Sequence, residues 1–183
     1  MPQTQRIVIT GAPGTGKSSL LHIFEEDGFV VHPEMARQLI KEESLKSSTC
    51  VPWEDHKTFG EVLFTRQREQ YVAATENKIN FYDRGIPDNL GYLRRDGLQN
   101  KKLEAEALLY PYHHQVFLTP PWQEIYEQDT ERWEDFNLML EIHHALVDIY
   151  TFFGYDIIEV PKTDIQSRVD FIKNNLSLRE LHS

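Results

Sequence analysis

The sequence predicts an α/β fold in which helices cover both faces of a five-stranded parallel β-sheet. Three observations lead to this prediction. Short apolar runs typical of buried strands alternate with stretches that have the three-four spacing of amphipathic helices, glycine or proline ends most of these runs, and a glycine-rich loop follows the first strand. This order implies a doubly wound, three-layer α/β/α architecture with right-handed crossovers. The expected strands are residues 6–10, 29–32, 78–82, 115–119 and 155–160.

Apolar periodicity also locates the helices between these strands. A long helix is expected at 53–77, where Arg66 extends an apolar face. Two interpretations of Arg66 remain open: a polar group presented to a second substrate, or an arginine at the edge of the core whose charged end reaches water. Arg94 and Arg95 are interpreted as part of a solvated helix face. The other expected helices run from the glycine-rich loop to Asp27, from Glu34 through residue 40, over 89–110 as two short pieces, over 139–153 and over 165–176.

Length and composition indicate one globular domain over residues 1–183. This length suits a single core, and 40% hydrophobic with 26% charged residues is ordinary for a globular protein. The formal net charge of −10 argues against a nucleic-acid partner, because binding to nucleic acids requires clustered Lys and Arg. No stretch approaches the length of a membrane span, and the first residues lack an apolar signal region, so we expect a cytoplasmic protein.

A complete Walker A phosphate loop separates the first strand from the first helix, with the sequence Gly11-Ala12-Pro13-Gly14-Thr15-Gly16-Lys17-Ser18. Its glycines let successive backbone N–H groups point at one anion, and the helix adds its positive N-terminal end. Lys17 can reach the β- and γ-phosphates of a nucleotide, and the Ser18 hydroxyl can ligate Mg²⁺. We expect the Lys17 side chain to pack against nothing, because such a loop lies at the surface. The residues expected to bind the nucleotide are Gly11, Ala12, Pro13, Gly14, Thr15, Gly16, Lys17, Ser18 and Ser19.

Two acidic residues follow later strands, at the edge of the sheet where ligands bind in open α/β folds. Asp83 ends the apolar run 79–82, which is the Walker B pattern, and we expect it to hold Mg²⁺ together with Ser18, directly or through water. Glu34 follows the second strand. Its position leaves two interpretations open: a carboxylate that faces the phosphate loop, or a charge at a helix N-terminus that pairs with Arg37.

Further segments resemble those of one group of proteins. The charged segment at about 121–136 is too polar for a core and is interpreted as a surface lid. Four segments outside the phosphate loop carry the resemblance. They are Pro33-Glu34-Met35-Ala36-Arg37, Asp83-Arg84-Gly85 with Asp88, Glu131-Arg132-Trp133-Glu134 in the lid, and the fifth strand followed by 164–168. With the phosphate loop, they make almost the whole chain resemble the P-loop nucleoside and nucleotide kinases. The chain is most similar to the small AAA-labelled ATPase/kinase domains that include the ribosylnicotinamide kinase domain of the bacterial NAD regulator.

The resemblance implies a strand order of 2-3-1-4-5, a small lid, and ATP with Mg²⁺ as the phosphate donor. It implies that Glu34 acts as the catalytic base. It also implies that Asp83 and Arg84 bind phosphate or acceptor, and that Arg132 closes over the transferred phosphate with the lid.

Two functions are consistent with these residues. The first is a phosphotransferase that moves the γ-phosphate of ATP to a small-molecule hydroxyl acceptor, nucleoside-like in character. Its expected catalytic residues are Lys17, Glu34, Asp83, Arg84 and Arg132. The alternative is a regulatory NTPase with slow hydrolysis and a protein or lipid partner. A carboxylate after the second strand that faces an open cleft would favour the phosphotransferase.

Overall fold

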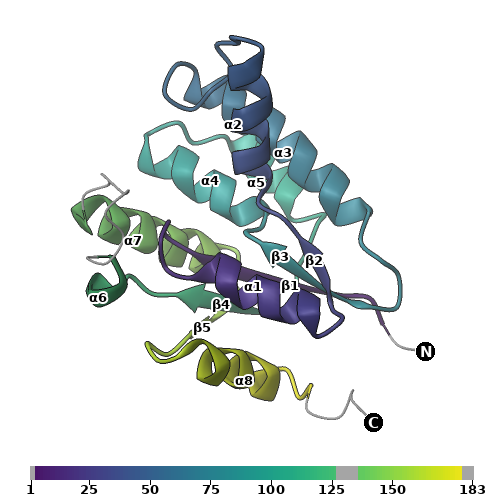
Figure 1. Ribbon diagram of the computed structural model, residues 1–183. Helices are drawn as coiled ribbons and strands as arrows, with labels where there is room; N and C mark the ends of the chain where they lie inside the picture. The colour runs from purple at the N-terminus through teal and green to yellow at the C-terminus, as the bar shows by residue number, and fades with distance from the viewer. Residues whose placement is uncertain (1–2, 127–135, 179–183) are drawn as a thin grey trace.

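A five-stranded parallel sheet forms the centre of the protein. The computed structural model describes residues 3–126 and 136–178. The strands are β1 (Gln5–Gly11), β2 (Val30–His32), β3 (Ile79–Asp83), β4 (Gln115–Thr119) and β5 (Asp156–Glu159). Their order is β2-β3-β1-β4-β5, and every neighbouring pair is parallel (Figure 1). The fold class and the strand order are therefore confirmed.

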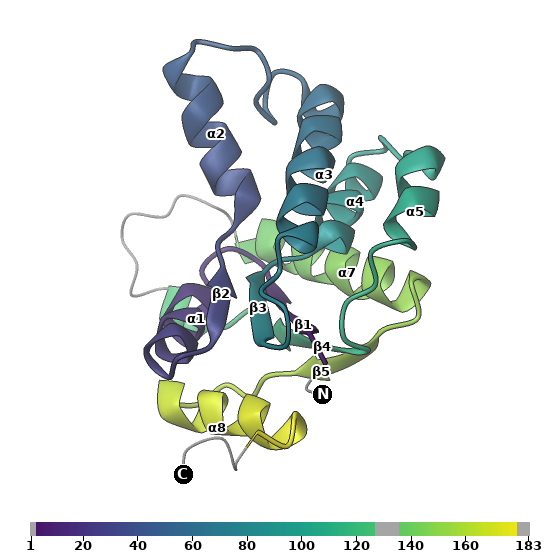
Figure 2. The ribbon, with the colours of Figure 1, turned by 90° about the vertical axis from the view of Figure 1, so that its right-hand side faces the viewer.

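Helices cover both faces of this sheet. They are α1 (Lys17–Glu26), α2 (Met35–Leu45), α3 (His56–Val72), α4 (Ile86–Arg95), α5 (Lys101–Ala107), α6 (Gln123–Tyr126), α7 (Phe136–Phe152) and α8 (Ile165–Asn175). One apolar cluster joins α1 and α8 to the first face, and another joins α3, α4 and α7 to the opposite face (Figure 1). α2 packs against α3, and the two helices extend away from the sheet together (Figure 2). None of the described helices is long and apolar enough to cross a membrane.

Side-chain alternation along β1 explains why both faces are covered. Ile7 and Ile9 pack against the α1 and α8 side, whereas Val8 packs against the α3, α4 and α7 side. Successive residues of a strand face opposite sides of a sheet, so an uninterrupted apolar run has two apolar faces to bury. The unbroken run of apolar residues in the first strand therefore requires a layer of helices on each side.

The α3 helix is shorter than predicted. It begins after Asp55, whose side chain accepts a hydrogen bond of 3.0 Å from the Thr58 N–H, and it ends at Val72. Arg66 follows Phe59 and Leu63 on the face of α3 that packs against α2, and its charged end reaches the surface at the edge of that contact. The Arg66 guanidinium is exposed and lies 3.2 Å from a carboxylate oxygen of Glu42 on α2. An acidic partner on a neighbouring helix holds this side chain at the surface, and helical spacing alone cannot reveal such a partner.

The interpretation of Arg94 and Arg95 as a solvated helix face is wrong, because both are partly buried. Arg94 Nε donates to Glu104 at 2.6 Å, and its guanidinium carbon lies 3.9 Å from the centre of the Phe152 ring. Arg95 Nε donates to Asp96 at 2.6 Å. These partners come from α5, from α7 and from the end of α4, so the arginines connect elements rather than face water.

Candidate functional site

The phosphate loop, Glu34 and Asp83 meet at one edge of the sheet. The loop leaves β1, Glu34 follows β2, and Asp83 is the last residue of β3. β3 lies between β2 and β1, and the three strands are parallel, so their carboxyl ends are adjacent. The structure thus brings together residues that lie far apart in the sequence, where open α/β sheets bind ligands.

Glycine is required at the start of the phosphate loop. Gly11 has a φ of +147°, and a Cβ atom at this position would lie 2.1 Å from Oγ1 of Thr119. Gly16, at φ +83°, ends the curl just before α1. Hydroxyls fix the loop between them: Thr15 Oγ1 donates to the Ala12 carbonyl at 2.9 Å and lies 2.6 Å from Thr119 Oγ1. The loop is therefore held in a curled conformation by β4 as well as by its own residues.

Lys17 is buried, so the prediction that it packs against nothing is wrong. Only 6% of its surface is exposed. Its Nζ atom donates to the carbonyls of Gly11 and Ala12, both at 2.9 Å. Burial, assisted by the nearby Arg84 charge, lowers the pKa of Lys17 to about 7. The curled loop encloses the side chain, and the ammonium bonds the carbonyls that line it.

Ser18 and Asp83 both line a cavity of about 430 Å³ between α1 and α2. Burial raises the pKa of Asp83, although Lys17 opposes the shift, and the carboxylate atom Oδ1 is buried without a hydrogen-bond partner. Hydroxyl and carboxylate oxygens are the donors that Mg²⁺ prefers. In the described part of the chain, no three His, Cys, Asp or Glu residues are grouped to hold a metal. Ser18 and Asp83 therefore offer two oxygen donors of the kind that suits Mg²⁺ in one cavity.

Glu34 precedes the first turn of α2 and contacts two arginines, of which Arg37 is the partner expected from the sequence. Its Oε1 accepts a hydrogen bond of 3.1 Å from Arg84 Nε, and its Oε2 lies 3.7 Å from the exposed guanidinium of Arg37. Burial alone would raise the pKa of this carboxyl group, but Arg84, Lys17 and Arg37 together hold the pKa below its usual value. Glu34 is thus an ionised carboxylate at neutral pH.

Arg84 is fixed between two carboxylates. It has a φ of +69°, unusual for a residue with a side chain, and it is only 7% exposed. Its Nη1 lies 3.4 Å from Oδ1 of Asp88. Asp88 also accepts hydrogen bonds from the Gly85 N–H at 2.8 Å, from the Tyr150 hydroxyl at 2.5 Å and from the Thr10 hydroxyl. The Gly85 bond starts α4 at Ile86, earlier than the sequence predicts.

Sequence reasoning missed the roles of Thr10 and Tyr150 in this network. Asp88 is part of the family resemblance, but no role was predicted for it. Tyr150 lies on a helix that was located only by its apolar periodicity. A periodic apolar pattern does not distinguish a tyrosine that fills space from one whose hydroxyl binds a buried carboxylate. Both positions depend on contacts between distant elements, so no local signal could have identified them.

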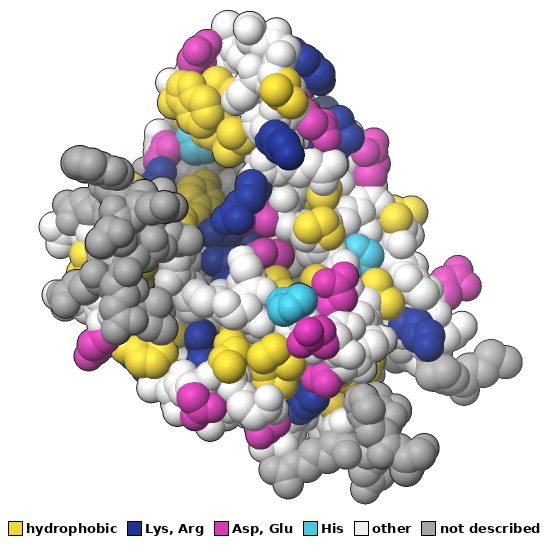
Figure 3. Space-filling model, viewed as in Figure 1, with side chains coloured by type: hydrophobic (Ala, Val, Ile, Leu, Met, Phe, Trp, Pro, Cys, Tyr) yellow, Lys and Arg dark blue, Asp and Glu magenta, His cyan; other side chains and the backbone are white. Residues whose placement is uncertain are grey.

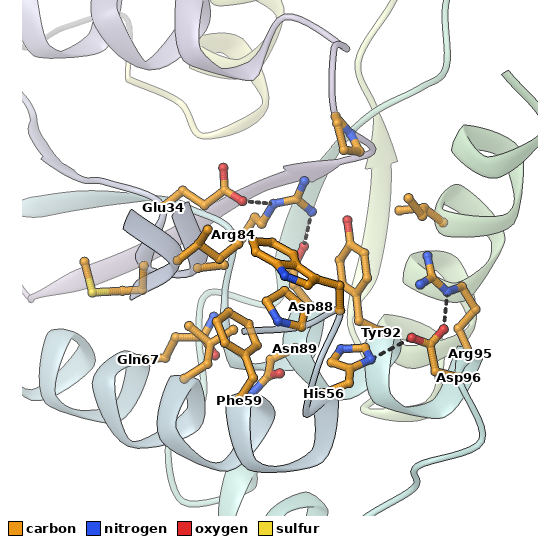
Figure 4. Close-up of a pocket in the computed structure, with 18 of the residues that line it drawn as sticks. Glu34, His56, Phe59, Gln67, Arg84, Asp88, Asn89, Tyr92, Arg95 and Asp96 are labelled. Atoms are coloured by element: carbon orange, nitrogen blue, oxygen red, sulfur yellow. Dashed lines mark hydrogen bonds and ion pairs between the residues drawn. The ribbon is translucent and has the colours of Figure 1, made fainter. Parts of the chain in front are cut away.

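A second, larger cavity lies on the other side of Glu34 and Arg84 (Figure 4). Its volume is about 530 Å³, and the aromatic side chains Trp53, Phe59 and Tyr92 contribute to its walls. Figure 3 shows the hollow on this face of the molecule, with Lys, Arg, Asp and Glu side chains gathered around it. Glu34 lines this cavity as well as the one that contains Ser18 and Asp83. The Glu34 carboxylate therefore lies between the cavity of Ser18 and Asp83, here called the phosphate-loop cavity, and the cavity with aromatic walls.

Polar groups mark two ends of the larger cavity. Gln67 donates through Nε2 to the Gly85 carbonyl at 2.9 Å, and its Oε1 is buried without a partner. At the other end His56 Nδ1 lies 2.6 Å from Asp96, which also binds Arg95 (Figure 4). The cavity thus combines apolar and aromatic walls with a limited set of polar and charged groups, among them Glu34, Arg84 and Asn89, as is typical of small-molecule sites.

The remaining predicted residues fall in three places. Ser19 is exposed in the first turn of α1, next to Ser18, and Pro13 lines the larger cavity. Of the predicted lid at 121–136, the structure describes residues 121–126 and residue 136. Arg132 lies outside the described residues.

Comparisons with known proteins agree with this architecture. A family model described as an AAA domain matches residues 6–168. No curated protein matches the chain. Among solved structures, thymidylate kinase from Ehrlichia chaffeensis is similar with a TM-score of 0.67 at 16% identity, covering 96% of this chain and 100% of that chain. Deoxyadenosine kinase from M. mycoides with bound dATP is similar with a TM-score of 0.62 at 16% identity, covering 94% and 100%.

Shikimate kinase from Aquifex aeolicus has the same fold, with a TM-score of 0.57 at 16% identity over 98% of this chain and 100% of that chain. Likeness at this level of identity concerns the fold alone. The family match is independent of it and extends from the first strand to α8. The chain therefore belongs to the AAA domain family, as a P-loop nucleotide-binding domain whose fold resembles that of small-molecule kinases.

Proposed function

We propose that this protein transfers the γ-phosphate of ATP, with Mg²⁺, to a hydroxyl group of a small nucleoside-like acceptor. The observation that carries the proposal is the position of Glu34, which lines both the cavity that contains Ser18 and Asp83 and the cavity with aromatic walls. A residue between a phosphate site and an acceptor site is where a phosphotransferase needs its base.

At the proposed phosphate-donor site, the charges in the described part of the chain suit a nucleoside triphosphate. Phosphoryl transfer needs positioning and stabilisation of the charge on the moving group more than covalent chemistry. The phosphate loop and Lys17 would hold the phosphates, and Ser18 with Asp83 would hold Mg²⁺. The bound ion would neutralise charge on the phosphate oxygens. Arg132 would add a positive charge from the lid.

On the acceptor side, the larger cavity suits a nucleoside. Its volume of about 530 Å³ lies within the usual range for small-molecule sites, and its aromatic walls can stack on a planar ring. Two similar structures are kinases of a nucleoside and of a nucleotide, deoxyadenosine kinase and thymidylate kinase. They support this acceptor class by analogy of fold, as does the resemblance to the ribosylnicotinamide kinase domain of the bacterial NAD regulator.

In the proposed reaction the acceptor oxygen attacks the γ-phosphorus. The bond between that phosphorus and the bridging oxygen of the β-phosphate breaks, ADP leaves, and the hydroxyl proton passes to Glu34. The lowered pKa of Glu34 keeps it ionised and able to accept this proton at neutral pH. Arg84, which donates to Glu34 Oε1, would keep the carboxylate directed at the acceptor.

A screen followed by a single substitution tests the proposal. Thermal-shift measurements with ATP, Mg²⁺ and a panel of ribonucleosides and deoxyribonucleosides should identify the acceptor, because ligand binding stabilises the folded state. Mass spectrometry should then show one added phosphate on that acceptor. Glu34→Gln should lower the rate of transfer by about 10²–10⁴, while ATP affinity changes little. Glu42→Gln, on the same helix and outside both cavities, is the matched control.

Two other outcomes have defined meanings. If Glu34→Gln loses Mg²⁺-dependent ATP binding together with transfer, Glu34 is a metal partner rather than the base. If no acceptor is found and Glu34→Gln leaves slow ATP hydrolysis unchanged, the phosphotransferase proposal is wrong, and a regulatory NTPase becomes the better description.

A further inference from the structure

A buried guanidinium contacts the phosphate loop and lines neither of the two cavities. It belongs to Arg168 in the first turns of α8, and it is only 3% exposed. Its Nη2 donates to the Thr15 carbonyl at 3.0 Å. Its Nη1 lies so close to Gly16 that a Cβ atom there would be 2.8 Å away. Arg168 therefore contacts two consecutive residues of the loop from outside.

This guanidinium has no counter-ion in the described part of the chain. No carboxylate there pairs with it, and its Nε is buried without a hydrogen-bond partner. Burial lowers the pKa of Arg168, and no neighbouring charge opposes that shift. Arginine nevertheless remains protonated in proteins, so the charge is retained. Burying an unpaired charge is strongly unfavourable, and such groups are normally paired.

The position of Arg168 indicates what its counter-charge is. The contacted residues, Thr15 and Gly16, belong to the loop whose inner side is shaped to bind phosphates. If support of the loop were the only need, a neutral donor to the Thr15 carbonyl would provide it without the cost of a buried charge.

We propose that Arg168 is a positioning residue of the nucleotide site, whose buried charge is compensated by the phosphates of the bound nucleotide. Arg168 holds the Thr15–Gly16 segment in place and adds positive potential behind it. It does not touch the reacting atoms. The inference depends on nucleotide binding by the loop and not on transfer to an acceptor, so it stands or falls independently of the proposed reaction.

Two substitutions separate the charge from the hydrogen bond. Arg168→Gln keeps an N–H donor and removes the charge, whereas Arg168→Lys keeps the charge. We expect Arg168→Gln to weaken Mg²⁺–ATP binding about tenfold or more, measured by calorimetry on the full chain, and to leave the melting temperature of the free protein unchanged or raised. Arg168→Lys should recover most of the ATP affinity. Lys173→Gln, on the same helix but paired with Asp27 at 2.7 Å, should leave ATP affinity unchanged.

Three results would overturn the inference. The first is wild-type ATP affinity in Arg168→Gln, since the charge would then be irrelevant. The second is an Arg168→Lys variant as weak as Arg168→Gln, which would assign the effect to side-chain shape. The third is an Arg168→Gln protein that is unfolded or clearly less stable without nucleotide, which would make Arg168 a structural brace. Because these measurements concern binding alone, they remain decisive if no phosphate acceptor is found.

Discussion

Arg84 Nε lies 3.1 Å from Oε1 of Glu34, although the two residues are 50 positions apart in the sequence. The same guanidinium lies 3.4 Å from Asp88, which receives further hydrogen bonds from β1 and α7. Glu34, which follows β2, is therefore oriented by Arg84, which follows β3. Arg84 is in turn held by Asp88, whose other hydrogen bonds come from β1 and α7. A substitution of a residue that binds Asp88 should therefore alter the orientation of Glu34, although that residue does not contact Glu34.

Tyr150→Phe tests the anchoring of Asp88 at this end of the network. The hydroxyl of Tyr150 donates to Asp88 at 2.5 Å, and both residues are buried. Removal of the hydroxyl leaves a buried carboxylate oxygen with one donor fewer, so the free energy of unfolding should fall by about 1–3 kcal/mol. Urea denaturation measures this change. Tyr110→Phe, which alters a hydroxyl outside the network, should have a much smaller effect. Equal losses in the two variants would argue against an anchoring role for Tyr150.

Lys17 predicts an unusual dependence of stability on pH. Its pKa is lowered from 10.5 to about 7, mainly by burial. Between these two values the unfolded chain carries a proton that the folded chain lacks, so raising the pH stabilises the folded state across this window. Below pH 7 both states are protonated and the destabilising effect is complete. Relative to Lys17→Met, the wild-type protein should therefore gain stability from pH 7 to 10, measured by denaturation at each pH without nucleotide. Lys101→Met, at an exposed position on α5, should show no such difference.

The same group predicts proton uptake when ATP binds. Phosphate oxygens next to Lys17 favour its charged form, so a proton should be taken up on binding above pH 7. ATP affinity should then fall by up to about tenfold for each pH unit above 7. Calorimetry in buffers with different ionisation enthalpies measures the uptake directly. Lys17→Met should bind ATP weakly and should show neither effect. A wild-type affinity that stays constant from pH 7.5 to 9.5 would contradict the lowered pKa.

Asp83→Asn tests the proposed Mg²⁺ site. Asp83 Oδ1 is buried without a partner, and burial raises the pKa of the carboxyl group. Replacing this carboxylate with an amide should leave the free protein as stable as before, or more stable, because an unfavourable buried charge is removed. The enhancement of ATP binding or turnover by Mg²⁺ should be largely lost. Asp170→Asn, on the exposed side of α8, serves as the control. Retention of the full Mg²⁺ effect in Asp83→Asn would remove Asp83 from the site.

The parts of this structure that the sequence predicts are those with local signals. The strand–loop–helix unit at Gly11 to Ser18 is recognisable because its glycines, lysine and hydroxyl occur within eight consecutive residues. Strand order followed from the family resemblance, since periodicity shows where strands occur but not which ones are neighbours. The Walker B pattern at Asp83 is similarly local.

The rest depends on packing between elements that are distant in the chain. Tyr150 reaches Asp88 only because α7 packs on α4, and Arg168 reaches Thr15 only because α8 packs beside α1. The burial of Lys17 has the same origin, because it results from the curl of the loop against β4. A one-dimensional pattern does not record these contacts. This explains why the sequence suggested an unpacked Lys17 and gave no sign that Tyr150 binds a buried carboxylate.

Trp53 provides a test of the acceptor cavity itself. Its side chain lines the cavity of about 530 Å³, yet the residue is 68% exposed. An aromatic side chain this exposed contributes little to the stability of the free protein. A planar acceptor that stacks on it would bury the indole, and stacked aromatic pairs contribute about 0.5–1.5 kcal/mol beyond the area that they bury. Trp53→Ala should therefore leave the melting temperature almost unchanged.

The same variant should raise the KM for the acceptor by several-fold to about tenfold, whereas ATP affinity should stay at the wild-type value, because Trp53 does not line the phosphate-loop cavity. Leu45→Ala is the matched control, since Leu45 is 80% exposed on α2 and lines neither cavity. Steady-state kinetics with varied acceptor at saturating ATP separates the two constants. If Trp53→Ala instead weakens ATP and leaves the acceptor KM unchanged, the aromatic cavity is the donor site, and the assignment of the two cavities must be exchanged.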